Sequence, residues 1–211
     1  MILGASWQEV LLAIPAVLVA ISFHEYAHGW MANRLGDPSP ARAGRLSPEP
    51  WAHIDWIGLL ALLIFGFGWA KPMPVDVRYF RHPRRDLMLT GAAGPLANFV
   101  VAWIAALVVA GLSHVPGFLA GGGIGPWVLR VVGDMVLLNV AFGLFNLIPI
   151  PPLDGSRVVS GALPPRWADR YNRLEPYGIW ILLGLLLFTP VLQWIMVPVR
   201  QTVVNWLVSL T

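Results

Sequence analysis

Long runs of uncharged, apolar residues are the feature that most constrains what this chain can fold into. The clearest run covers residues 87–112 and contains no charged side chain. A transmembrane helix needs about 20 such residues, because the hydrocarbon core of a bilayer is about 30 Å thick. Only 12% of the 211 residues are charged, against about 25% in a typical soluble domain. The chain is therefore predicted to be an integral membrane protein.

Two further apolar runs are long enough to cross a bilayer. The first covers residues 10–32, where Glu25 is the only charged side chain. The second covers residues 127–150 and carries Arg130 and Asp134 near one end. These two residues lie one helical turn apart, so each can neutralise the charge of the other.

The segment 57–70 is apolar but short for a span, and its three glycines disfavour a straight helix. The loops before and after this segment are both basic. We therefore interpret the segment as a re-entrant hairpin that enters and leaves the membrane on one side. The stretch WAKPMPVDV, residues 69–77, contains two prolines in an extended pattern, which indicates an edge strand of that hairpin.

Pro190 interrupts the apolar residues 177–211, which form either one kinked span with a surface helix or two shorter spans. The predicted fold class is an all-α polytopic membrane protein with about 4–6 transmembrane helices, a re-entrant hairpin or short β segment, and a proline-broken helix. Because the spans use most of the length, we expect residues 1–211 to form a single membrane-embedded domain.

The 14 lysine and arginine residues lie in short loops beside the apolar runs and do not form one basic stripe. This pattern is typical of membrane topology and argues against a nucleic-acid partner. Basic residues accumulate on the cytoplasmic side, so the loops at 34–53, 71–85 and 157–173 are predicted to be cytoplasmic. We expect a multi-pass protein of the cell membrane whose basic loops touch lipid head groups.

A His-Glu-x-x-His pattern, HEYAH, lies inside the first apolar run. On a helix His24 and His28 face the same way and can bind one Zn²⁺ ion per chain. Zinc lowers the pKa of a bound water to about 7, and Glu25 could take its proton and deliver it to a leaving amine. The alternative is that these side chains only hydrogen-bond to each other or to neighbouring helices. An ionisable group in a membrane helix is costly outside an aqueous or metal-containing interior, which favours the metal site.

A catalytic zinc site needs a third protein ligand, and the absence of cysteine restricts it to histidine or a carboxylate. Asp154 is the strongest candidate because it follows a run of prolines that breaks the preceding helix. The alternative for Asp154 is a turn or cap before Gly155. His24 lies ten residues before Arg34 and Asp154 three before Arg157, so the two parts of the site are predicted near the same, cytoplasmic side.

The remaining histidines, His53, His82 and His114, have no comparable partners, and we expect them to be interfacial or solvated. A metal-dependent enzyme is not the only class of protein that could use these metal ligands. The alternatives are a zinc transporter or scaffold, and a degenerate protease that binds membrane partners without cutting them. A transporter usually has paired repeats or several polar spans, and the sequence has neither. The combination of metal ligands with Glu25 favours an enzyme.

Four motifs together resemble the site-2 protease family of intramembrane zinc metalloproteases. They are HEYAH at 24–28, GWAKPMPV at 68–75, GAAGPLANF at 91–99 and NLIPIPPLDGSR at 146–157. The resemblance covers about residues 8–175, the expected catalytic core, and leaves the helices of 176–211 without diagnostic motifs. This family often carries a PDZ or CBS domain, and the chain resembles the minimal branch that has neither.

The resemblance implies a protease that cuts peptide bonds within or near the transmembrane segments of other membrane proteins. It implies His24, His28 and Asp154 as zinc ligands and Glu25 as the catalytic acid and base. It further implies that the GWAKPMPV segment pairs with an unwound substrate as a β-strand. The residues implied in substrate binding are Asn146, Pro72, Pro74 and Asn98.

Overall fold

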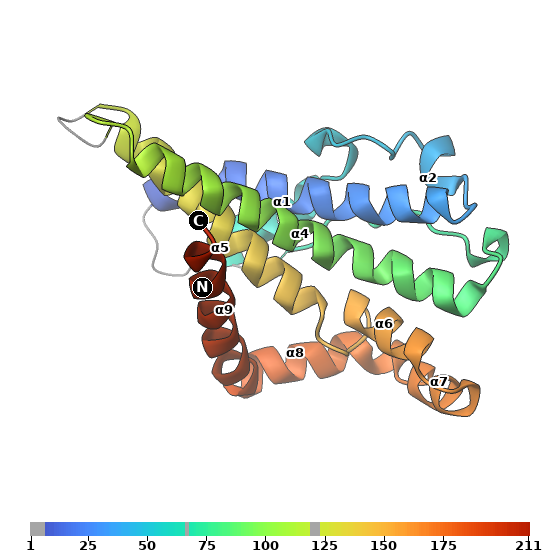
Figure 1. Ribbon diagram of the computed structural model, residues 1–211. Helices are drawn as coiled ribbons and strands as arrows, with labels where there is room; N and C mark the ends of the chain where they lie inside the picture. Colours follow the sequence, from blue (N-terminus) through green and yellow to red (C-terminus); the bar gives the residue numbers. More distant parts are fainter. Residues whose placement is uncertain (1–6, 66–67, 119–122) are drawn as a thin grey trace.

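Three long helices form the body of the protein. The computed structural model describes residues 7–65, 68–118 and 123–211, and the regular elements within these ranges are all helical. The long helices are α1 (Trp7–Arg34), α4 (Pro83–Ser113) and α5 (Gly125–Asn146), which lie side by side in Figure 1. Each is long and apolar enough to cross a membrane, as the three apolar runs predicted.

Small residues let these helices approach one another closely. Ala102 of α4 and Val140 of α5 are completely buried where the two helices meet. A β-carbon added to Gly143 of α5 would lie 3.1 Å from the carbonyl oxygen of Pro95 on α4. Ala102 and Gly143 therefore allow α4 and α5 to pack closely.

The outer surface of α4 is apolar. Its exposed large side chains include Leu96, Val100, Trp103, Ile104 and Leu107. Monomeric soluble proteins rarely expose a continuous apolar surface of this kind, whereas lipid tails would cover it in a membrane. Together with the three spanning helices, this surface identifies an integral membrane protein.

The connection from α1 to α4 is built of short helices and turns. It contains α2 (Ser39–Arg42), η1 (Pro50–Ala52), α3 (Trp56–Phe65) and η2 (Val77–Tyr79). After α3 the chain runs back along this helix, and the Lys71 N–H donates a 2.9 Å hydrogen bond to the His53 carbonyl. A β-carbon on Gly58 would overlap the backbone of Trp69, so the outgoing and returning arms touch.

Neither the predicted re-entrant hairpin nor the predicted strand is confirmed. Residues 66–67 lie outside the described residues, and residues 68–76 form no regular strand. The predicted depth of this segment in a membrane remains a prediction.

The C-terminal part begins with the proline break after α5. It comprises α6 (Asp154–Ala162), α7 (Pro165–Asn172), η3 (Glu175–Tyr177), α8 (Gly178–Phe188) and α9 (Val191–Ser209). α6 packs against α4, and α9 returns to pack against α5 and α4 (Figure 1). Pro165–Phe188 and α9 pass the length and hydropathy test for a span only as a pair, bent by 84°. The described helices thus give three candidate spans, or four with this bent pair, and the upper part of the predicted range of 4–6 is not confirmed.

Candidate metal centre

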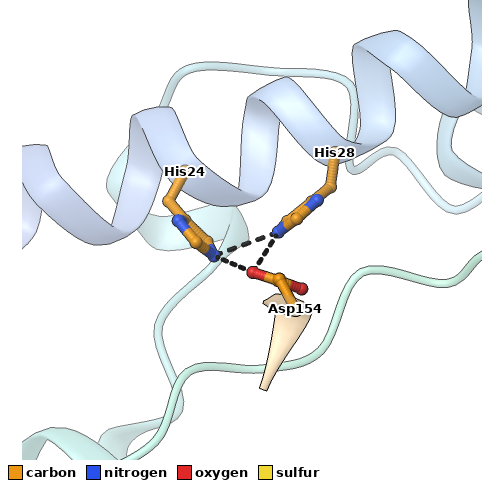
Figure 2. A group of neighbouring side chains, drawn as sticks. All are labelled: His24, His28 and Asp154. Atoms are coloured by element: carbon orange, nitrogen blue, oxygen red, sulfur yellow. Dashed lines mark hydrogen bonds and ion pairs between the residues drawn. The ribbon is translucent and has the colours of Figure 1, made fainter. Parts of the chain in front are cut away.

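His24, His28 and Asp154 meet inside the bundle, between α1 and the start of α6. Figure 2 shows the two imidazoles pointing from α1 toward the Asp154 carboxylate. The two Nε2 atoms are 3.0 Å apart, and Asp154 Oδ2 lies 3.0 Å from His24 Nε2 and 3.1 Å from His28 Nε2. None of the three residues is more than 6% exposed. The structure therefore brings the three predicted ligands together, while their binding of a metal remains a prediction.

The opposite side of each imidazole ring is fixed by a hydrogen-bond acceptor. His28 Nδ1 lies 2.7 Å from the carbonyl oxygen of Thr90, which can only accept a hydrogen bond. His24 Nδ1 lies 2.7 Å from Asn98 Oδ1. The Asn98 amide nitrogen donates to the Ala20 carbonyl and to Asn139 Oδ1, both at 2.9 Å, which assigns Oδ1 as the acceptor. Both histidines are therefore protonated on Nδ1, and in the neutral ring each Nε2 atom offers its lone pair to a metal.

Three possible metal ligands thus converge. The two Nε2 atoms and Asp154 Oδ2 lie 3.0–3.1 Å from one another in a site with little access to water, where buried polar groups need a proton or a cation to link them. A cation bound by all three would meet this need. Ligands that hold a tetrahedral zinc ion at 2.0–2.1 Å lie roughly 3.3 Å from one another, close to the observed spacing. The donor set fits zinc, and three protein ligands are the number found in catalytic zinc sites.

The proline break after α5 places Asp154 at the first position of α6. Leu153 is still extended, and α6 begins with the Asp154 carboxylate near its positive N-terminal end. A β-carbon on Gly155 would overlap the backbone of Leu147, so the chain folds tightly back against the end of α5. The second carboxylate oxygen of Asp154 lies 3.6 Å from Arg157 Nη1. This turn aims Asp154 at the histidines of α1.

α4 and α5 close the site from the other sides. Gly94 of α4 lies directly against the imidazoles, since a β-carbon there would overlap His28 Nε2 and lie 2.7 Å from His24 Cε1. The ring of Phe142 on α5 packs edge-on against His24, with 4.9 Å between the ring centroids. Only glycine leaves room for both histidines at this point of α4.

Glu25 lies beside the three predicted ligands and keeps a free carboxylate. It is half-buried, and in the described part of the chain no hydrogen bond or ion pair engages it. Glu25 also interacts electrostatically with Arg45 in the neighbouring loop. Burial lowers the pKa of Arg45, and the Glu25 carboxylate opposes this effect. The role of Glu25 in proton transfer remains a prediction.

The residues predicted to bind substrate occupy different environments. Asn146 is half-buried at the end of α5, where its amide donates a 3.0 Å hydrogen bond to the carbonyl of Phe142. Pro72 and Pro74 lie on the extended segment after α3, and Pro72 is exposed. Asn98 is completely buried, and its amide groups are used by His24, Ala20 and Asn139. The structure thus places Asn98 behind a predicted ligand.

The environment of one histidine differs from the sequence-based expectation. His53 was expected to be interfacial or solvated, but it is completely buried, with its Nε2 2.6 Å from the Ser47 carbonyl. The expectation was wrong because the contacts that bury His53 come from the folding of its own loop. His82 and His114 are exposed, as expected.

Three residues of the site were not singled out from the sequence: Thr90, Gly94 and Asn139. A signal for Asn139 was present, because a polar side chain within an apolar run needs a buried partner. Thr90 acts through its backbone carbonyl and Gly94 through its lack of a side chain, and no sequence pattern reports either contact.

Comparisons with known proteins agree on one class of protein. The family model for peptidase family M50 matches residues 124–188. Three similar proteins each bear the name "Putative zinc metalloprotease". YwhC of Bacillus subtilis is 33% identical, covering 88% of this chain and 84% of its own. Rip2 of Mycolicibacterium smegmatis is 29% identical, with 87% and 69% covered. MJ0611 of Methanocaldococcus jannaschii is 26% identical, with 83% and 75% covered. No solved structure matches the chain.

The contact between Gly94 and the imidazoles gives a first prediction. Replacing Gly94 with alanine forces a methyl group into the space of His28 Nε2, so zinc affinity should fall by more than about tenfold. Gly111→Ala, in the same helix but with open space around it, is the matched control and should bind zinc like the wild type. Titration of the purified apoproteins with zinc measures both. Equal affinities would show that Gly94 does not border a metal site.

The hydrogen bond behind His24 gives a second prediction. Asn98→Ala removes the acceptor that fixes the His24 ring, and loss of such a supporting group lowers metal affinity by about 10–100-fold. Asn205→Ala, an exposed asparagine on α9, is the control. Competition with a chelator of known zinc affinity measures the difference. Unchanged affinity in Asn98→Ala would contradict a supporting role.

Proposed function

This chain belongs to peptidase family M50, the site-2 protease family, and we propose that it is a zinc metalloprotease that hydrolyses peptide bonds within or near the transmembrane segments of membrane proteins. One observation carries the proposal. Two imidazole Nε2 atoms and one carboxylate oxygen converge within 3.1 Å of one another inside an apolar helical bundle, next to a glutamate with a free carboxylate. A zinc transporter or scaffold would have no need of that glutamate.

The residues of the site divide the chemistry between them. When bound, zinc supplies a Lewis acid that activates water and polarises a peptide carbonyl. His24, His28 and Asp154 hold it, and the acceptors at the two Nδ1 atoms keep both rings in the required tautomer. Glu25 takes a proton from the attacking water and gives it to the leaving amine. Asn146, near Phe142 at the end of α5, donates a hydrogen bond to the substrate carbonyl.

A substrate helix must unwind before it can be cut, because the carbonyls of a helix are engaged in its own hydrogen bonds. The extended segment after α3, with Pro72 and Pro74, offers an unwound substrate a strand to pair with. Transmembrane proteins with helix-breaking residues near the cleaved bond are therefore the proposed substrates.

The positions of the basic loops support a topology for the protein in the membrane. α1 ends and α4 starts at the same end of the bundle in Figure 1, and the basic loops 34–53 and 71–85 lie in the connection between them. Basic loops favour the cytoplasmic side. We therefore propose that the protein lies in the cell membrane with its active site opening toward the cytoplasm.

Glu25→Gln tests the proposed reaction. The amide cannot accept a proton, so the variant should bind zinc like the wild type while cleavage falls by about 10²–10⁴-fold. Glu175→Gln, an exposed glutamate outside the site, is the control and should cleave normally. Zinc content and cleavage of a reconstituted single-span substrate measure the two effects. A Glu25→Gln variant that cuts at nearly the wild-type rate, or a wild type whose cutting survives removal of zinc, would contradict the proposal.

A further inference from the structure

Two buried side chains of one loop hold the extended segment 71–76 in place. Arg45 donates hydrogen bonds to the carbonyl oxygens of Lys71, at 2.7 Å, and Pro72, at 3.2 Å. At the other end of the segment, Asp37 Oδ2 accepts a 2.7 Å hydrogen bond from the backbone N–H of Asp76. Arg45 is only 5% exposed and Asp37 is completely buried. The segment is thus tied at both ends by side chains where a neighbouring strand is absent.

Both tying residues are themselves fixed. The other oxygen of Asp37 accepts a 2.9 Å hydrogen bond from the Ser39 N–H at the start of α2. Arg45 Nη2 lies 3.5 Å from Nδ1 of the completely buried His53. Burial lowers the pKa of His53, and the Arg45 charge lowers it further, so its ring is neutral at pH 7 and can accept from Arg45. Neither tie can swing away without disturbing the loop.

The middle of the segment keeps unpaired backbone groups. Met73 and Val75 each have an N–H and a C=O that find no hydrogen-bond partner in the described part of the chain. The two residues are two positions apart, the spacing at which an extended chain presents its polar groups along one edge. The Met73 side chain is held inside the protein, since the residue is only 9% exposed. An unpaired backbone edge can pair with another extended chain.

The segment passes next to the metal centre. Met73 packs on α1 at Gly29, the residue after His28, and a β-carbon on Gly29 would lie 3.0 Å from the Met73 sulfur. Glu25, one turn earlier on α1, is close enough to interact electrostatically with both Arg45 and His53. A chain that paired with Met73 and Val75 would run beside the predicted ligands.

We infer that Arg45 and Asp37 are positioning residues that hold segment 71–76 extended, so that Met73 and Val75 bind the unwound backbone of a substrate beside the metal centre. This inference rests on the proposed function. The guanidinium of Arg45 suits the task because its planar fork can donate to two successive carbonyls, which a lysine ammonium does less well. The two side chains hold the ends of the segment and leave the polar groups of Met73 and Val75 for the substrate.

Disulfide trapping tests the binding step without requiring cleavage. The chain has no cysteine, so Val75→Cys introduces a single thiol. The experiment uses a Glu25→Gln background, which keeps the substrate uncut. The variant is mixed with a series of single-span substrates, each with one cysteine at a different position, and an added oxidant promotes disulfide formation. Because a disulfide forms only when the Cα atoms approach to about 4.4–6.8 Å, we expect a few adjacent substrate positions to cross-link. Adding Arg45→Ala should lower that yield by about tenfold, since the segment loses two charge-assisted hydrogen bonds.

Arg42→Ala is the matched control. Arg42 belongs to the same loop and is exposed, and it contacts the Tyr79 hydroxyl, not the carbonyls of the segment. Its removal should leave the cross-linking yield unchanged. Arg45→Lys and Asp37→Asn, which keep the size of the side chains, should give intermediate yields and replace Arg45→Ala if that variant does not fold.

Kinetics on the wild-type background separate positioning from general damage. Arg45→Ala should raise KM for a membrane substrate by about tenfold, with zinc content and kcat close to wild type, and Arg45→Lys should restore part of the loss. The inference would be overturned if Arg45→Ala cross-linked with the wild-type yield and kept the wild-type KM. It would also be overturned if Arg45→Ala lost zinc and lowered kcat while KM stayed unchanged. Cross-linking that depends on Arg45 supports it even if the wild type cuts nothing, so failure of the proposed proteolysis is recognised separately.

Discussion

Two imidazoles and one carboxylate meet in the middle of this protein, and the residues around them fix their positions. His24 Nε2, His28 Nε2 and Asp154 Oδ2 lie 3.0–3.1 Å from one another, in a place that water hardly reaches. Polar groups buried in this way are stable only when a proton or a cation links them. Asn98 and the Thr90 carbonyl hold the two rings from behind. The fold therefore brings the three predicted ligands together at one point.

Glycines and a proline break in the helices make room for the residues of the site. Gly94 leaves space for the imidazoles, and Gly91 lets α6 lie against α4, with a β-carbon there only 2.9 Å from the Cβ of Arg157. The proline break ends α5 at Asn146, and α6 starts at Asp154, so the third predicted ligand returns to the depth of the first two. In a membrane, backbone freed by such a break must be satisfied by protein or by water in a cavity. The break thus places Asp154 beside the two histidines of α1.

Much of the centre could be predicted from the sequence because its determinants are local. The spacing of His24 and His28 places both on one face of any helix, and the prolines before Asp154 mark where a helix must stop. Contacts made by crossing helices were beyond reach: Gly94, Thr90 and Asn139 matter only because α4 and α5 pass beside α1 at a particular height. His53 was misjudged for a related reason, since its burial depends on Arg45 and Ser47 in a loop without periodicity. The stretch 69–77 was recognised as extended, but its prolines and side-chain ties take the place of the strand pairing expected there.

The central claim is that one zinc ion is held by His24, His28 and Asp154, and anomalous diffraction at the zinc absorption edge tests it most directly. For crystals of the zinc-loaded wild-type protein, the account predicts a single strong anomalous peak inside the bundle. That peak should lie about 2.0–2.2 Å from His24 Nε2, His28 Nε2 and an oxygen of Asp154, with a fourth position open to solvent or substrate. A peak bound by other side chains, or zinc-loaded protein without a peak between α1 and α6, would contradict it.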